Sequence, residues 1–364
     1  MTIFVNKIFV MFGETLQNGR KLKGWKLREL SAQVGIDQTL MSRFECGDRL
    51  PNAKQLEEIA GVLNLNFDDL MVEWMAEKVV KIIEFAPRAS EVLMAAESRV
   101  EYLRKGEQEE GLDISKAIKN KLVEVDELKS RWDASHPLNQ TQLRRMEEYF
   151  DINYTYESNR IEGNTLTLQE TALVMNEGLT IGGKSMREHL EVINHAEAID
   201  FVRTLIENKE KLTRRTLLEI HRLVLKEIDK ENAGVYRKVP VKIGGSSHVP
   251  PQPFLLDKLM EDFFNHFRRV ERQMHPVILA AEMHERLVSI HPFIDGNGRS
   301  GRLLMNFILL SNGYTRANIK GDSSSRLAYY QALENVQTDN DLEPFYLLVI
   351  REVKRSLEEH LELA

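Results

Sequence analysis

The chain has 364 residues, of which 42% are hydrophobic and 29% are charged, and its formal net charge is −7. This length provides for two or three domains, and the acidic balance excludes a protein that binds polyanions nonspecifically over its whole surface. The single cysteine, Cys46, excludes an internal disulfide and a cysteine-rich metal site, as is typical of a protein in a reducing cytoplasm.

Residues 1–12 are apolar but are interrupted by Asn6 and Lys7. This stretch is too short to span a bilayer, and no small-residue cleavage site follows it. We therefore expect a cytoplasmic protein without a membrane segment.

The segment after residue 12 shows short helical patterns separated by glycine and proline. Apolar residues Leu27, Leu30 and Val34 mark one helix, and residues 38–45 form the next after a turn at Gly35. Two further apolar helical patterns follow. The arrangement resembles the Cro/phage-repressor helix-turn-helix family, and it predicts a helix-turn-helix domain over residues 1–75.

The resemblance implies operator DNA as a partner, with the second helix of the motif in the major groove. Residues 12–54 hold eight Lys or Arg against five Asp or Glu, a local charge of +3. Leu27 departs from the family, which usually has Gln there, and an interaction module without DNA binding stays open, as does a homodimer. The residues expected to face DNA are Gln38, Thr39, Ser42 and Arg43.

Residues 76–145 are helical in pattern, highly charged and without a chemical motif. We expect a solvated helical connector, with helices that pack on the domain that follows.

Residues 291–302 read HPFIDGNGRSGR and lie between two apolar helical patterns. They form a loop that leads into a helix N-terminus, where free N–H groups and the helix dipole favour a phosphate. Gly296 and Gly298 let the backbone approach an anion closely. Arg299 and Arg302, at i and i+3, share one helix face and can bind further phosphate oxygens. His291, just outside, is a candidate general base.

The stretch matches every fixed position of the HPFx(D/E)GNGRxxR signature, so the chain resembles the Fic family of nucleotidyl transferases. The resemblance implies a mainly α-helical catalytic domain over residues 146–364 that transfers AMP from ATP to a Tyr, Thr or Ser hydroxyl of a target protein. His291, near its ordinary pKa of about 6.5, would accept the hydroxyl proton. Asp295 would hold Mg²⁺. Gly296, Asn297 and Gly298 would form the anion cradle, including the Asn297 side chain, and Arg299 and Arg302 would bind the β- and γ-phosphates.

Three further groups of residues follow from the pattern or from the resemblance. Residues 234–251 alternate as a strand does and contain a Gly-Gly-Ser-Ser turn, which predicts a small β-hairpin, in the family a flap over the active site. A surface hairpin without function is the alternative. Tyr329 and Tyr330 either stack on adenine or belong to the core. We expect His284 to be a packing residue and Phe293 to anchor the loop.

Ser158 to Gly163 match the inhibitory pattern (S/T)xxxE(G/N) of the family. The resemblance implies an inhibitory helix near residues 152–162, in which Ser158 and Glu162 share one face and Glu162 pairs with Arg302 to block the γ-phosphate. Two alternatives stay open: an enzyme that mainly removes AMP, with Glu162 orienting water, and a transcriptional regulator whose Fic domain senses a nucleotide.

Overall fold

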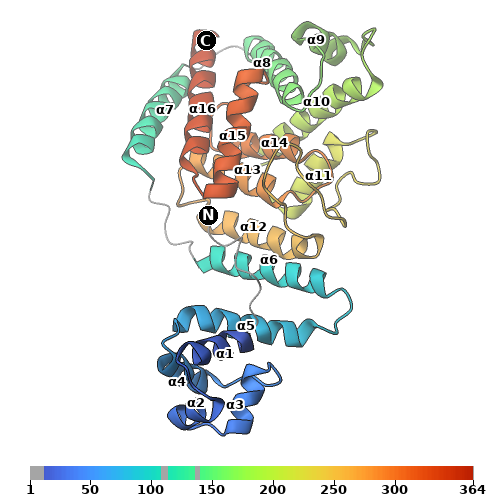
Figure 1. Ribbon diagram of the computed structural model, residues 1–364. Helices are drawn as coiled ribbons and strands as arrows, with labels where there is room; N and C mark the ends of the chain where they lie inside the picture. Colours follow the sequence, from blue (N-terminus) through green and yellow to red (C-terminus); the bar gives the residue numbers. More distant parts are fainter. Residues whose placement is uncertain (1–11, 108–113, 136–139, 364) are drawn as a thin grey trace. The chain divides into compact units, whose positions relative to one another are not determined.

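The computed structural model describes residues 12–107, 114–135 and 140–363, in two compact units, 1–107 and 108–364 (Figure 1). The apolar stretch considered above therefore lies outside the described residues, apart from Phe12. No helix in the described ranges is long and apolar enough to cross a membrane.

In the first unit, helices α1 to α5 surround a small apolar core, as expected of a helix-turn-helix domain. The turn between α2 and α3 begins at Gly35, with a φ of 65°, and the side chain of Asp37 accepts hydrogen bonds from two N–H groups that open α3. Arg20 joins α1 to the end of α3, because it donates to both carboxylate oxygens of Glu45 at 2.6 and 2.7 Å. The helices are α1 (Phe12–Leu22), α2 (Leu27–Val34), α3 (Gln38–Glu45), α4 (Ala53–Leu63), α5 (Phe67–Ile83) and α6 (Ala89–Glu107).

The second unit is built around α13 and α14, which lie between α10 and α11 on one side and α15 and α16 on the other (Figure 1). Most residues of these two central helices are buried, and α14 buries two arginines among its apolar residues. Buried guanidinium groups are rare unless they are paired, so this helix is where a functional site is expected. The helices are α7 (Lys116–Ala134), α8 (Gln140–Ile161), α9 (Leu168–Glu177), α10 (Met186–Glu207), α11 (Arg214–Val224), the short 3₁₀ helix η1 (Pro253–Leu255), α12 (Leu256–Val270), α13 (Pro276–Ile290), α14 (Asn297–Ser311), α15 (Ser323–Asp339) and α16 (Glu343–Leu363).

The connector expected over 76–145 does not form a unit of its own. Its first part lies in α5 and α6 of the first unit, and its second part lies in α7 and the start of α8 of the second. Ile118, Leu122 and Val125 of α7 are buried in the core of the second unit. Helix α7 therefore packs on the second unit, as was expected of helices in this segment.

The β-hairpin expected over 234–251 is absent, since none of the residues that the structure describes forms a strand. Pro240 and Pro251 have no N–H group for a strand ladder. The buried Arg237 joins the two arms of this loop instead, by donating to the carbonyl oxygens of Val239 and Pro251. Its Nε also donates to the carbonyl oxygen of His291 at 2.8 Å. The Arg237 guanidinium thus joins the two arms of the loop, which hydrogen bonds between two strands would do in a hairpin.

Candidate functional site

The signature residues form a loop between the end of α13 and the start of α14. His291 ends α13 with a φ of 50°, a left-handed conformation that is uncommon outside glycine. Gly296, with a φ of 77°, precedes α14 and has no side chain that could cap the first N–H groups of the helix. The N–H groups at the start of α14 are therefore left without a side-chain cap from Gly296, which is the arrangement that an anion site at a helix N-terminus requires.

Two contacts hold the loop in shape. Phe293 is fully buried and stacks on the His221 ring, with centroids 3.6 Å apart, which confirms its expected anchoring role. The Asn297 amide accepts a hydrogen bond from the N–H of Phe293 at 3.0 Å and donates to its carbonyl oxygen at 2.9 Å. The amide nitrogen has a second N–H, so the expected hydrogen bond from Asn297 to phosphate stays a prediction.

His291 is arranged as a proton acceptor. Its Nδ1 lies 3.2 Å from the carbonyl oxygen of Val288, which can only accept, so Nδ1 carries the proton and Nε2 keeps a free lone pair. Burial lowers the pKa of His291 to about 4, well below the ordinary value that we expected. The imidazole is consequently neutral at physiological pH.

Arg302 is the most enclosed charge of the site, with a side chain that is 1% exposed. Its Nε donates to Ser158 Oγ at 3.1 Å, and its Nη2 donates to the Ser158 carbonyl oxygen at 2.9 Å and to Glu162 Oε1 at 2.7 Å. Burial works against its charge, but the nearby Glu162 outweighs it, and the pKa of Arg302 is raised. The ion pair expected between Glu162 and Arg302 is thus present.

Glu162 lies one residue beyond the end of α8, in a turn that Gly163 closes with a φ of 100°. Its carboxylate lies against the start of α14: a Cβ atom on Gly298 would be 2.4 Å from Glu162 Oε1, closer than real Cβ atoms approach. The carboxylate therefore takes the position at the helix N-terminus that suits a phosphate oxygen.

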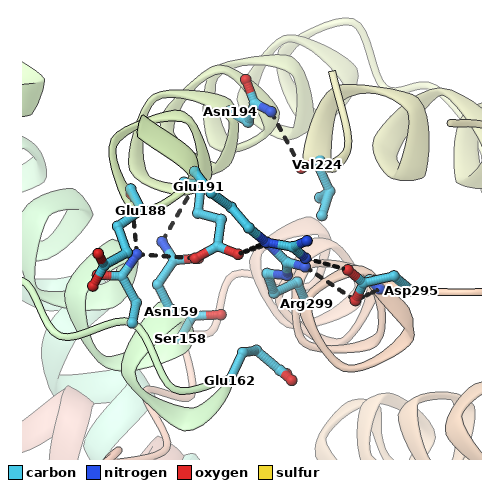
Figure 2. Close-up of polar contacts among 12 residues, drawn as sticks. Ser158, Asn159, Glu162, Glu188, Glu191, Asn194, Val224, Asp295 and Arg299 are labelled. Carbon is cyan, nitrogen blue, oxygen red and sulfur yellow. Dashed lines mark hydrogen bonds and ion pairs between the residues drawn. The ribbon is translucent and has the colours of Figure 1, made fainter. Parts of the chain in front are cut away.

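Arg299 lies between two carboxylates, as Figure 2 shows, with Glu191 on one side and Asp295 on the other. Its Nη2 donates to Asp295 Oδ1 at 3.3 Å, and its Nη1 lies 3.6 Å from Glu191 Oε1. The guanidinium is only 2% exposed, and its Nε has no hydrogen-bond partner among the described residues. An anion at this place would satisfy that donor.

Asp295 is the one carboxylate of the signature. Burial alone would raise the pKa of Asp295, but Arg299, the Gly296 N–H group and Arg187 outweigh it, and the pKa is lowered. The side chain is ionised and 40% exposed. The structure holds no cluster of three or more metal-ligating side chains in its described ranges. A single carboxylate fits Mg²⁺, because this ion commonly takes one or two carboxylates and completes its shell with water and substrate phosphates.

The two tyrosines differ in role. Tyr329 is 1% exposed, and its hydroxyl lies 3.0 Å from His284 Nε2 and 3.5 Å from Arg302 Nη1, so its ring has no face for adenine. It belongs to the core. Tyr330 is 45% exposed and donates to the carbonyl oxygen of Ile161 at 3.0 Å, so its ring remains accessible. His284 is fully buried, as expected of a packing residue.

The sequence interpretation missed the residues that α10 and α11 contribute. His221 of α11 is fully buried; its Nδ1 accepts from the Gly234 N–H at 2.9 Å, and its Nε2 donates to the carbonyl oxygen of Asp295 at 2.9 Å. Burial lowers the pKa of His221 to about 4. A histidine within the apolar stripe of an amphipathic helix was the available signal. No comparable signal marks Arg187 or Glu191 of α10.

The face of α3 in the first unit presents the residues expected to contact DNA. Gln38, Thr39 and Arg43 are exposed and Ser42 is half-buried. Leu27 packs against the core of this unit. The face is therefore accessible, which DNA recognition requires.

Two segments of the chain match known family models. Residues 211–309 match the Fic/DOC family, and residues 16–70 match a helix-turn-helix family. The chain is 36% identical over 243 residues to a protein adenylyltransferase Fic of Drosophila grimshawi, which covers 66% of this chain and 49% of that protein. It is 40% identical over 217 residues to the protein of the same name from Nematostella vectensis. This alignment covers 59% of this chain and 49% of that protein. The chain spans about half the length of these relatives.

Solved structures of Fic proteins have a fold similar to that of this chain. A Fic domain-containing signaling protein from Bacteroides thetaiotaomicron superposes with a TM-score of 0.60 at 29% identity, over 66% of this chain and 97% of that chain. Fic-1 from C. elegans gives a TM-score of 0.61 at 26% identity, over 96% and 97%.

Proposed function

Because this chain carries a Fic/DOC-family domain beside a helix-turn-helix domain, we propose that it is a protein adenylyltransferase held inactive by Glu162. The substrate is ATP, and AMP is transferred to a hydroxyl side chain of a target protein or of the chain itself. The observation that carries the proposal is the arrangement of a neutral His291 beside an uncapped helix N-terminus with two buried arginines.

The chemistry needs a base, an anion site and charge stabilisation. The target hydroxyl oxygen attacks the α-phosphorus, the bond to the bridging oxygen of the β-phosphate breaks, and pyrophosphate leaves. The hydroxyl proton passes to His291 Nε2, whose lone pair is free because Nδ1 is engaged with Val288. Arg299 and Arg302 would stabilise the charge that develops on the phosphates, and the N-terminal N–H groups of α14 would position them. Asp295 would hold Mg²⁺, which neutralises phosphate charge when bound.

The ion pair of Glu162 supports autoinhibition. Its carboxylate lies where a phosphate oxygen would lie and also takes one donor of Arg302. A phosphate cannot enter against this carboxylate, since like charges repel and the donor is already used. ATP would bind in a different position, with its α-phosphate turned away from His291.

Labelled ATP tests this proposal. The wild-type protein should label itself or a target weakly, Glu162→Gly should raise labelling strongly, and Glu162→Gly with Arg302→Ala should be inactive again, because the phosphate partner is then missing. Equal labelling by the wild type and Glu162→Gly would overturn autoinhibition. If the wild type releases AMP from a modified target and Glu162→Gly does not, the result would favour the reverse reaction.

A second function, DNA binding by the first unit, is favoured by the accessible face of α3. We propose that a homodimer binds an inverted repeat, with one α3 in the major groove of each half-site. Arg43→Ala should weaken binding of duplexes selected from a random pool, whereas a pool from which no sequence is enriched would support an interaction module.

A further inference from the structure

Four charged side chains form a closed ring around the signature loop, and two of them come from α10. Arg187 Nε donates to Glu191 Oε1 at 3.1 Å, and Arg187 Nη2 donates to Asp295 Oδ2 at 2.7 Å. Arg299 closes the ring between Asp295 and Glu191, at 3.3 and 3.6 Å (Figure 2). The ring holds two positive and two negative charges, so its formal charge is zero.

The members of the ring differ in their freedom to move. The side chains of Arg299 and Glu191 are 2% and 11% exposed, whereas that of Arg187 is 58% exposed. Glu191 Oε2 is also fixed by the amide of Asn164 at 3.0 Å, just beyond the turn that carries Glu162. Arg187 is therefore the member that can leave without exposing a buried charge.

The two oxygens of Asp295 are used differently. Oδ1 accepts from the Gly296 N–H at 2.6 Å and from Arg299 at 3.3 Å. Among the described residues, Arg187 alone bonds to Oδ2. Oδ2 is consequently the Asp295 oxygen at which a cation would bind. In this structure the Arg187 guanidinium bonds to it instead. A divalent cation bound to Oδ2 would lie close to that positive charge and be repelled by it.

We propose that Arg187 is a built-in competitor of the divalent cation: its guanidinium takes the place at Asp295 that the metal requires, and must move aside before the metal binds. The proposal rests on the proposed function, since it concerns the nucleotide's metal. Arg187 keeps a partner when it moves, because its Nε is bonded to Glu191. The contact is a second restraint on the resting site, separate from that of Glu162.

Binding of Mn²⁺, followed by electron paramagnetic resonance with the non-transferable analogue α,β-methylene ATP, tests this proposal without any transfer reaction. All variants carry Glu162→Gly, so that the analogue binds with its phosphates at the start of α14. Arg187→Gln and the length-matched Arg187→Met should bind Mn²⁺ about two- to fivefold more tightly, the range that loss of a half-exposed ion pair corresponds to. Arg187→Lys, which keeps the charge, should show a smaller gain.

Arg203 provides the matched control, because it lies on the same helix and pairs with Asp151 and Asp200 away from the signature loop. Arg203→Gln should leave Mn²⁺ affinity unchanged, and Asp295→Asn should remove the gain of Arg187→Gln. Unchanged or weaker Mn²⁺ binding by both Arg187→Gln and Arg187→Met would overturn the proposal, as would absence of Mn²⁺ binding in every variant. Failure of AMP transfer with a normal gain in Mn²⁺ affinity would count against the proposed function alone.

Discussion

Replacing Glu162 by glycine should make the second unit less stable while it makes the enzyme more active. Arg302 is 1% exposed while the carboxylate is in place, and without it the guanidinium keeps, among the described residues, only Ser158 and the Tyr329 hydroxyl. Glu162 itself is 32% exposed, which places the pair well short of a fully buried one. The loss is about 1.5–3 kcal/mol, the range for a hydrogen bond to a charged group.

For a unit of this size, such a loss corresponds to a fall in Tm of roughly 3–12 °C. Differential scanning calorimetry of the wild type and Glu162→Gly measures the change directly. Glu210→Gly, in an exposed loop between α10 and α11, is the control for inserting glycine and should leave both Tm and labelling unchanged. Addition of Mg²⁺ and ATP should recover more stability in Glu162→Gly than in the wild type, because only the variant has a free phosphate site.

The reasoning fails if Glu162→Gly is as stable as the wild type, because the carboxylate would then contribute nothing to holding Arg302. It also fails if the variant is destabilised but shows no added response to ATP, because the carboxylate would then have only a structural role.

The remaining predictions concern His291 and its support. In the Glu162→Gly background, His291→Ala should abolish transfer but leave ATP binding nearly intact, measured by calorimetric titration, because the phosphate site lies in the following helix. Arg237→Ala should lower the transfer rate by roughly tenfold or more, because misplacing a catalytic group by about 1 Å can cost that much, and should expose residues 238–250 to limited proteolysis, because this guanidinium joins the loop to the His291 carbonyl oxygen. An unchanged rate and cleavage pattern would contradict that role. The pKa of His291 is lowered to about 4, so the imidazole is already unprotonated at pH 6. The kcat/KM for transfer should therefore stay level between pH 6 and 8 and fall only as the pH approaches 4. A kcat/KM that falls to half its value near pH 6.5 would contradict the depressed pKa.

The signature and its surroundings could be predicted because their residues are adjacent in sequence. The two apolar helical patterns and the glycines fixed the loop at the start of α14, and the periodicity at Leu27 and Leu30 placed α2. The pair of Glu162 and Arg302 joins residues 140 positions apart and came from the family resemblance rather than from any local pattern.

Features that depend on tertiary contacts were missed or misread. Alternation over 239–243 suggested a strand, yet Arg237 satisfies the carbonyl groups of that loop from the side. Tyr329 was left open between adenine and core, and only burial against His284 decides it. In the sequence, nothing distinguishes Arg187 from the other arginines. Its bond to Asp295, 108 positions away, exists only in the folded chain.

The central claim is transfer of AMP by a site that Glu162 restrains, and the position of the label in ATP tests it most directly. Glu162→Gly protein should become labelled from ATP carrying ³²P in the α-phosphate and not from ATP carrying it in the γ-phosphate. Mass spectrometry should then find one AMP moiety on a Ser, Thr or Tyr hydroxyl, and His291→Ala in the same background should remove it. Label from the γ-phosphate, or no label in the Glu162→Gly protein from either form with any target, would contradict the account.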